Sequence, residues 1–159
     1  MKTPVTLTLN GSETAAFADP GQSLLEFLRR GVGDLTPKYG CGQGTCGSCT
    51  VLIDGAPHLA CLVLAETVEG RAVETAGGLA MGADLHPLQT AFIEGFAAQC
   101  GYCTPGMLMA AKALLDRNPN PTRDEVIEAI SGNLCRCTGY EPIVQAVLAA
   151  ARAPRRAVP

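Results

Sequence analysis

The sequence lacks several features that mark common classes of protein. It contains no tryptophan, only 4% aromatic residues and only two histidines. No apolar run approaches the roughly 18 residues that span a bilayer, and the first ten residues, MKTPVTLTLN, lack the apolar stretch of about 7 to 15 residues found in a secretory signal. We therefore expect a cytoplasmic protein without direct membrane insertion.

An excess of charge of one sign is also missing. The chain has 12 Lys and Arg against 15 Asp and Glu, a formal net charge of −3. Nucleic acids and anionic membranes attract clustered basic residues, and the only such cluster is the terminal ARAPRRAVP, so no nucleic-acid partner is expected. The sequence has no Walker loop or dinucleotide fingerprint, and no Ser, His and acidic arrangement suited to nucleophilic catalysis. No catalytic residue is predicted.

Cysteine, by contrast, is abundant, with eight residues in the chain. Thiols in the cytosol are kept reduced, so metal ligation is a better explanation than four disulfides. In the segment NLCRCTGY, Cys135 and Cys137 stand one residue apart, too close for ordinary disulfide geometry. These two sulfurs are therefore expected to bind something other than each other.

The first half of the sequence has the pattern of a small mixed sheet packed on one helix. Apolar residues alternate over residues 4–10, and Asn10-Gly11 predicts a tight turn into a second strand over 14–18. Helical spacing over 24–28 ends at Gly31. The remaining expected strands are TVLIDG from Thr50, PHLACLVLA over 57–65 after a turn at Asp54-Gly55, and RAVET over 71–75.

From about residue 76 the composition changes to a Gly- and Ala-rich connector, followed by helical periodicity. The four expected helices run from Pro87 to about Gln99, from a cap at Thr104 to Asn118, from a capping box of Thr122 and Glu125, and from Pro142. They predict a compact helical bundle behind a domain boundary. Two cysteine pairs stand directly before helix starts, where helix dipoles favour negative charge.

The first four cysteines are Cys41, Cys46, Cys49 and Cys61. Their spacing, C-x4-C-x2-C followed by a distant cysteine, is typical of plant-type 2Fe-2S ferredoxins. The segment KYGCGQGTCGSCT supplies glycines, which let backbone N–H groups approach the sulfurs of a negatively charged cluster. Zinc sites more often use two close cysteine pairs, which the isolated Cys61 does not provide.

The second four cysteines are Cys100, Cys103, Cys135 and Cys137. Their spacing, C-x2-C and C-x-C, is compatible with zinc or with an iron-sulfur cluster, and the helix N-termini favour the latter without settling the choice. A Rieske centre is disfavoured because neither His58 nor His86 adjoins a cysteine pair. We expect His86 at a helix start and His58 on a strand surface.

Four segments together carry every cysteine except Cys61: KYGCGQGTCGSCTVLIDG, LHPLQTAF, QCGYCTPGM and SGNLCRCTGY. They closely resemble the small iron-sulfur subunit of molybdenum hydroxylases, the xanthine oxidase family, over about residues 4 to 150. The resemblance implies an α+β chain, with a β-grasp, plant-type ferredoxin-like domain over residues 1–76, a connector over 77–85 and a four-helix bundle over 86–159. It also implies two 2Fe-2S clusters in place of zinc.

The resemblance further implies roles for individual residues. Cys41, Cys46, Cys49 and Cys61 would ligate an outer cluster near a flavin subunit, and Cys100, Cys103, Cys135 and Cys137 an inner cluster near a molybdopterin subunit. Gln99 and Cys137 would also approach the pterin, although Gln99 could instead cap the end of its own helix. The implied partners are a large molybdopterin-binding subunit, together with an FAD-binding medium subunit, in a heterotrimer or a dimer of heterotrimers.

The implied function is electron transfer without catalysis by this chain. Substrate oxidation at molybdenum, with water as the oxygen source, releases two electrons, and each cluster passes one at a time toward FAD. A free ferredoxin-type carrier is the first alternative, but such carriers usually have strongly acidic docking faces, which 15 acidic against 12 basic residues do not supply. A zinc-stabilised structural protein is the second.

Overall fold

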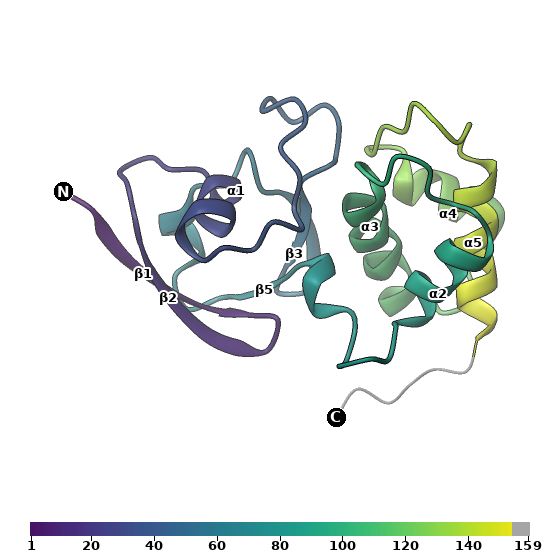
Figure 1. Cartoon of the computed structure of the whole chain (residues 1–159), viewed down its shortest axis with the longest axis horizontal. Helices are drawn as coiled ribbons and strands as arrows, with labels where there is room; N and C mark the ends of the chain where they lie inside the picture. The colour runs from purple at the N-terminus through teal and green to yellow at the C-terminus, as the bar shows by residue number, and fades with distance from the viewer. Residues whose placement is uncertain (154–159) are drawn as a thin grey trace.

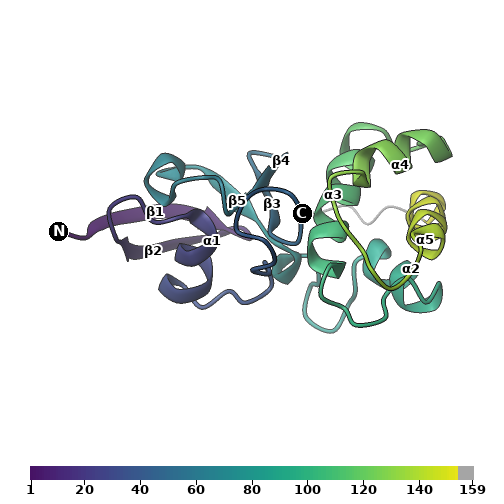
Figure 2. The ribbon, with the colours of Figure 1, turned by 90° about the horizontal axis from the view of Figure 1, so that it is seen from above.

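The computed structural model describes residues 1–153. Figures 1 and 2 show a lobe of strands followed by a lobe of helices. The strands form one five-stranded mixed sheet in the order β2-β1-β5-β3-β4. They are β1 (Thr3–Leu9), β2 (Ser12–Ala18), β3 (Thr50–Ile53), β4 (Ala56–Leu59) and β5 (Ala72–Glu74). The expected α+β class is confirmed.

Two tight turns set the register of the sheet, as the sequence predicts. Asn10 and Gly11 both have positive φ (51° and 83°), as do Asp54 and Gly55 (49° and 78°), which suits the strand twist of a two-residue hairpin. The first turn pairs Leu9 with Ser12 in an antiparallel ladder. Strand β5 then lies between β1, to which it is parallel, and β3, to which it is antiparallel.

A short helix covers this sheet, comprising α1 (Leu24–Glu26) and a π-helical turn η1 (Phe27–Gly31). The expected strand over 57–65 is wrong beyond Leu59. The backbone turns there, with Leu62 N donating to Leu59 O at 2.9 Å, and the carbonyls of Ala60 and Val63 accept from residues at the start of α1. Residues Ala65–Val68 form a 3-10 turn, η2, so Cys61 lies on a loop.

The second lobe contains four helices: α2 (Pro87–Glu94), α3 (Thr104–Arg117), α4 (Arg123–Ile130) and α5 (Glu141–Arg152). A 3-10 turn, η3 (Ala76–Gly78), leads toward them. The expected capping box of Thr122 and Glu125 is confirmed, and His86, expected at a helix start, forms a second one that was not predicted from the sequence. Leu88 N donates to His86 Nδ1 while His86 N donates to Gln89 Oε1, and Thr122 and Glu125 make the same reciprocal exchange at α4.

Helix α2 ends five residues earlier than the predicted Gln99. Gly95 follows it, and Phe96 then adopts φ +51°, with Phe96 N donating to Ile93 O at 3.2 Å and Ala97 N donating to Phe92 O at 2.9 Å. This is the hydrogen-bond pattern of a Schellman cap, which stops a helix. Helix α3 begins at the predicted Thr104, but the capping position belongs to Cys103.

Each lobe has its own buried core. In the first, residues of β1, β3 and β5 pack with α1, and in the second α2 to α5 pack together. Leu52 is the exception, because its fully buried side chain points from β3 into the helical core. Helix α3 therefore lies against β3, as Figure 2 shows. No helix within residues 1–153 has the length and apolar character required to cross a bilayer.

Candidate metal centres

The first four cysteines come from three places around the sheet. Cys41 and Cys46 lie on the long loop before β3, Cys49 is buried directly before that strand, and Cys61 lies just after β4. The thiols form a connected set, since Cys41 interacts with Cys46, and Cys49 with both Cys46 and Cys61. The loop and the β3–β4 hairpin thus gather all four.

The second four cysteines come from the loops before α3 and α5. Cys137 Sγ lies 3.6 Å from Cys100 Sγ, and Cys103 interacts with Cys135 and Cys100. The cysteines nearer the helical core, Cys103 and Cys135, are half-buried, while Cys100 and Cys137 are exposed. Within residues 1–153, no three His, Cys, Asp or Glu side chains are arranged around a position for a single metal ion.

The first site fits an anionic metal-sulfur group. A Cβ on Gly40 would lie 2.7 Å from Cys46 Sγ, so only glycine leaves this sulfur its space. Gly42, Gly44 and Gly47 have φ of 69°, 79° and 69°, which lets the loop wrap around the thiols. Backbone N–H groups of Gln43 and Thr45 donate to Cys41 Sγ at 3.5 and 3.3 Å.

The pKa values of two cysteines in this first site shift in opposite directions. Hydrogen bonds, led by the one from the Thr45 side chain, lower the pKa of Cys41 to about 6. Burial raises the pKa of Cys49 to about 12. A thiol must lose its proton to ligate metal, so binding at Cys49 needs a nearby positive charge, which a metal cation would supply.

The second site fits the same kind of group. Thr138 Oγ1 donates to Cys135 Sγ at 3.1 Å; although burial of Cys135 opposes it, the hydrogen bonds from Thr138 lower the pKa of this thiol. Burial raises the pKa of Cys103 to about 12. Thr104 Oγ1, in the residue after Cys103, is a buried side-chain oxygen for which residues 1–153 provide no hydrogen-bond partner.

Helix starts lie beside both loops, as the sequence predicts. Cys103 is the N-cap of α3, and Cys137 stands three residues before Tyr140, the N-cap of α5. The positive ends of these helix dipoles favour an anionic group. Gln99 is exposed on the loop five residues beyond the end of α2, so it does not cap that helix.

The two cysteine groups meet where the loops of the two lobes touch. Leu134 N donates to Cys46 O at 2.9 Å, and Asn133 Nδ2 donates to Gly47 O at 2.8 Å. A third bond joins the hydroxyl of Tyr102 to the carbonyl of Tyr39 at 2.6 Å. Sequence reasoning missed these contacts because the partners are more than 60 positions apart in the chain.

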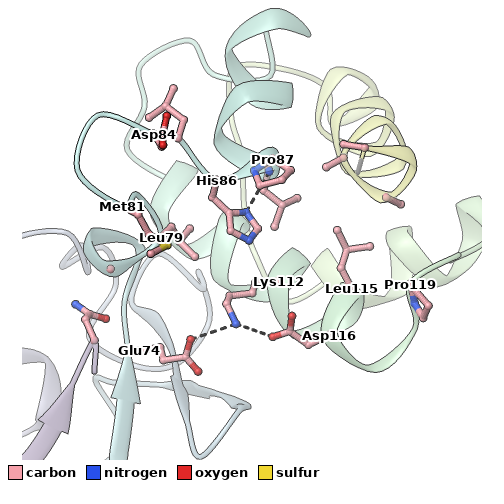
Figure 3. A pocket seen from close by; sticks show the side chains of 17 residues that line it. Glu74, Leu79, Met81, Asp84, His86, Pro87, Lys112, Leu115, Asp116 and Pro119 are labelled. Carbon is pink, nitrogen blue, oxygen red and sulfur yellow. Dashed lines mark hydrogen bonds and ion pairs between the residues drawn. The ribbon is translucent and has the colours of Figure 1, made fainter. Parts of the chain in front are cut away.

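A separate cavity of about 510 Å³ lies between the connector and the helices, and Figure 3 shows its lining. Lys112 Nζ stands between Glu74 and Asp116, at 3.1 and 2.6 Å from their carboxylates. Although burial of Lys112 opposes it, these two carboxylates raise the pKa of its ammonium. None of the eight cysteines lines this cavity, so it is distinct from both metal sites.

Two family models match the chain and together cover most of it. The 2Fe-2S iron-sulfur cluster binding domain matches residues 7–80, and the [2Fe-2S] binding domain matches residues 67–148. The nicotine 6-hydroxylase small subunit of Paenarthrobacter nicotinovorans is 49% identical over 91% of this chain and 87% of its own. The nicotinate dehydrogenase small FeS subunit of Eubacterium barkeri is 46% identical over 92% of this chain and 93% of its own.

Solved structures agree with the sequence relatives. Quinoline 2-oxidoreductase from Pseudomonas putida 86 has a chain that is 49% identical with a TM-score of 0.92, covering 94% of each chain. The aldehyde oxidoreductase of Desulfovibrio desulfuricans is 44% identical with a TM-score of 0.90, over 93% of this chain but 17% of the other. This chain therefore belongs to the small 2Fe-2S subunits of the molybdenum hydroxylase (xanthine oxidase) family, which are non-catalytic electron-transfer subunits of oxidoreductases.

Proposed function

We propose that each group of four cysteines holds one 2Fe-2S cluster. The outer set is Cys41, Cys46, Cys49 and Cys61, and the inner set is Cys100, Cys103, Cys135 and Cys137. When bound, each cluster takes up and releases one electron at a time. The glycine-lined space at Cys46, the N–H donors to Cys41 and the hydroxyl donor to Cys135 support this assignment.

The contact that carries the proposed function is the hydrogen bond from Leu134 N to Cys46 O. Leu134 is joined by a peptide bond to Cys135, and Cys46 belongs to the other cysteine set. One hydrogen bond and a few covalent bonds therefore connect a ligand of the inner cluster to a ligand of the outer one. This short connection suits electrons that pass singly from the inner site to the outer site.

The same proposal assigns a division of the chain. Residues 1–76 form a β-grasp, ferredoxin-like domain, residues 77–85 the connector and residues 86–159 a four-helix bundle. Separate cores in the two lobes support this division. Residues 154–159 of the proposed bundle domain lie outside the described residues, and Leu52 is where the two cores meet.

The solvent exposure of the inner set suggests where a partner subunit binds. Cys100, Cys137 and Gln99 are all exposed, so a partner is needed to shield a cluster there from solvent. We assign this side to a large molybdopterin-binding subunit, with Gln99 and Cys137 contacting the pterin. In the aldehyde oxidoreductase of Megalodesulfovibrio gigas, a segment 42% identical to this chain makes up 16% of one longer polypeptide, which supports a large partner.

In this proposal the outer set faces a second partner, an FAD-binding medium subunit. Tyr39 and Leu62 are 55% and 62% exposed beside that set, and they offer apolar surface for docking. Electrons then leave the molybdopterin site, cross the inner and outer clusters and reach FAD. The assembly is a cytoplasmic heterotrimer or a dimer of heterotrimers.

Purification of the tagged chain from its native cell tests this assembly. The expected result is co-purification of a large subunit that carries molybdopterin, together with a flavoprotein. Recovery of the chain alone, with iron but without molybdopterin, would instead support a free ferredoxin-type carrier.

A further inference from the structure

Asn133 is a buried polar residue at the junction between the two lobes. Its side chain is only 5% exposed. The amide nitrogen donates to Gly47 O at 2.8 Å and to Thr50 Oγ1 at 3.2 Å. These partners lie 86 and 83 positions earlier in the chain, so one side chain links the loop before α5 to the loop before β3.

Gly47 O is the centre of this junction. Besides the bond from Asn133, it accepts a hydrogen bond from Thr50 Oγ1 at 2.7 Å and another from Thr50 N at 3.0 Å. A buried amide is costly unless its donors find acceptors, and here both acceptors belong to the other lobe. Any movement of one loop away from the other would break the two bonds of Asn133 together.

The junction also has no spare room. A Cβ on Gly106, in the first turn of α3, would overlap Gly47 O. A Cβ on Gly47 would lie 2.7 Å from the Asn133 side chain and would overlap the carbonyl of Gly132. The loops therefore approach as closely as glycine allows, and they cannot move further together.

All of these residues stand next to cysteines of the two sets. Gly47 follows Cys46, Asn133 stands two residues before Cys135, and Gly106 stands three residues after Cys103. Hydrogen bonds resist separation of the loops at the same point where close packing resists their approach.

We propose that Asn133 is a positioning residue that, held between Gly47 and Gly106, fixes the separation of the two clusters and with it the rate of electron transfer between them. This inference rests on the proposed function, because it requires a cluster at each cysteine set. Electron transfer slows steeply as the gap between two redox groups widens, and magnetic dipolar coupling falls with the inverse cube of their distance. A small shift of the junction is therefore measurable.

Two substitutions test this from opposite directions in the intact complex. Asn133→Leu keeps a similar side-chain size but removes both donors, and Gly47 O retains its bonds from Thr50. Gly106→Ala keeps every donor but inserts a Cβ against Gly47 O, at a helical position where alanine is favoured over glycine. Gly132→Ala is the matched control, because a Cβ there meets no atom within 4 Å.

The readouts are the low-temperature EPR spectrum of the fully reduced complex and the rate of electron transfer between the clusters after rapid reduction. We expect both test variants to lose magnetic splitting and to transfer electrons more slowly, while each cluster keeps its own g values and reduction potential. Gly132→Ala should retain the original splitting and rate.

Unchanged splitting in both test variants, with both cluster signals present, would overturn the positioning role while leaving the proposed function intact. The same conclusion would follow if Gly132→Ala lost as much splitting as Gly106→Ala, or if Asn133→Leu lost a cluster. A single cluster signal in the unmodified complex would overturn the proposed function itself, and the positioning role with it.

Discussion

At the scale of single residues, the cysteines within each set differ in how deeply they are buried and in their pKa. Cys49 is 2% exposed at the start of β3, whereas Cys137 is exposed on the loop before α5. Hydrogen bonds hold the pKa of Cys41 at about 6, while burial raises the pKa of Cys103 to about 12. Surroundings rather than residue type therefore decide which of these thiols are reached by solvent and which are enclosed within the chain.

Replacing one cysteine from each set tests this difference. Cys137→Ser should perturb the EPR spectrum of the molybdenum centre and slow internal electron transfer, because this exposed residue is assigned to the pterin side. Cys49→Ser should disturb the outer cluster and leave the molybdenum spectrum unchanged. Equal damage to the molybdenum spectrum from both substitutions would show that Cys137 has no special position.

Sequence reasoning succeeds at the residue scale where chemistry is local. The cysteine spacing predicts both sets, and the capping box of Thr122 and Glu125 is readable because its two residues stand three positions apart. Asn133 offers no comparable signal. Its partners Gly47 and Thr50 become visible only when the lobes are folded together, and an asparagine near a cysteine pair does not predict them.

At the scale of elements, the end of α2 contains an unfavourable backbone conformation at Phe96. Phe96 occupies the left-handed position of a Schellman cap, which usually holds glycine, and its side chain is 82% exposed. The sequence pattern suggests a longer helix because the apolar residues continue past Gly95. A phenylalanine in the sequence does not indicate the positive φ that ends this helix, whereas a glycine at that position would.

Phe96→Gly should therefore stabilise the chain. The left-handed backbone conformation costs a non-glycine residue about 1 kcal/mol, and the exposed ring of Phe96 gains little stabilisation from packing. Urea unfolding followed by circular dichroism should show a higher midpoint. Phe96→Ala is the control, since it removes the ring but keeps a Cβ, and a gain as large as that of glycine would disprove the backbone explanation.

The start of α5 is tied to the start of α4 by an exposed ion pair, with Arg123 donating to both carboxylate oxygens of Glu141 at 3.0 and 2.6 Å. The Arg123 hydrogen bonds lower the pKa of Glu141 from 4.5 to about 2. The pKa of Glu141 in the folded chain lies below its ordinary value. The pair therefore stabilises the folded chain above about pH 4.5, and this stabilisation is lost as the pH falls toward about 2.

Glu141→Gln should consequently be less stable than the unmodified chain at neutral pH, and the gap should close as the pH falls through that range. Urea midpoints measured across the range provide the comparison. Glu128→Gln, the same change at an exposed site on α4, is the control. A gap that persists at the acid end of the range would rule out ionisation of Glu141 as the cause.

At the scale of the whole molecule, two lobes with separate cores are joined by the packing of β3 against α3 and by hydrogen bonds between the loops that carry the cysteines. The sequence predicts five strands, of which β4 ends earlier than expected, at Leu59, and the four helices of the second lobe, of which α2 ends earlier than expected, at Glu94. It does not predict that β3 packs against α3. Val51, Leu52 and Ile53 are three apolar residues in a row, a pattern that indicates a strand buried on both faces but does not indicate which element covers each face. Leu52 joins the helical core, while Val51 and Ile53 join the sheet core.

Leu52→Ala should destabilise the chain by about 3 kcal/mol, since a large buried side chain would be replaced by a cavity where the lobes meet. Denaturant unfolding gives this value directly. Leu62→Ala, at a side chain that is 62% exposed, should change the stability by much less. Similar losses at the two positions would show that Leu52 does not contribute as a core residue between the lobes.

The central claim is that this chain carries two 2Fe-2S clusters side by side, and joint metal analysis and EPR of the complex isolated from its native cell test it most directly. We predict iron and acid-labile sulfide in equal amounts, about four of each per chain, and two distinct signals after reduction. Zinc without iron or labile sulfide, or iron with a single cluster signal, would contradict the account.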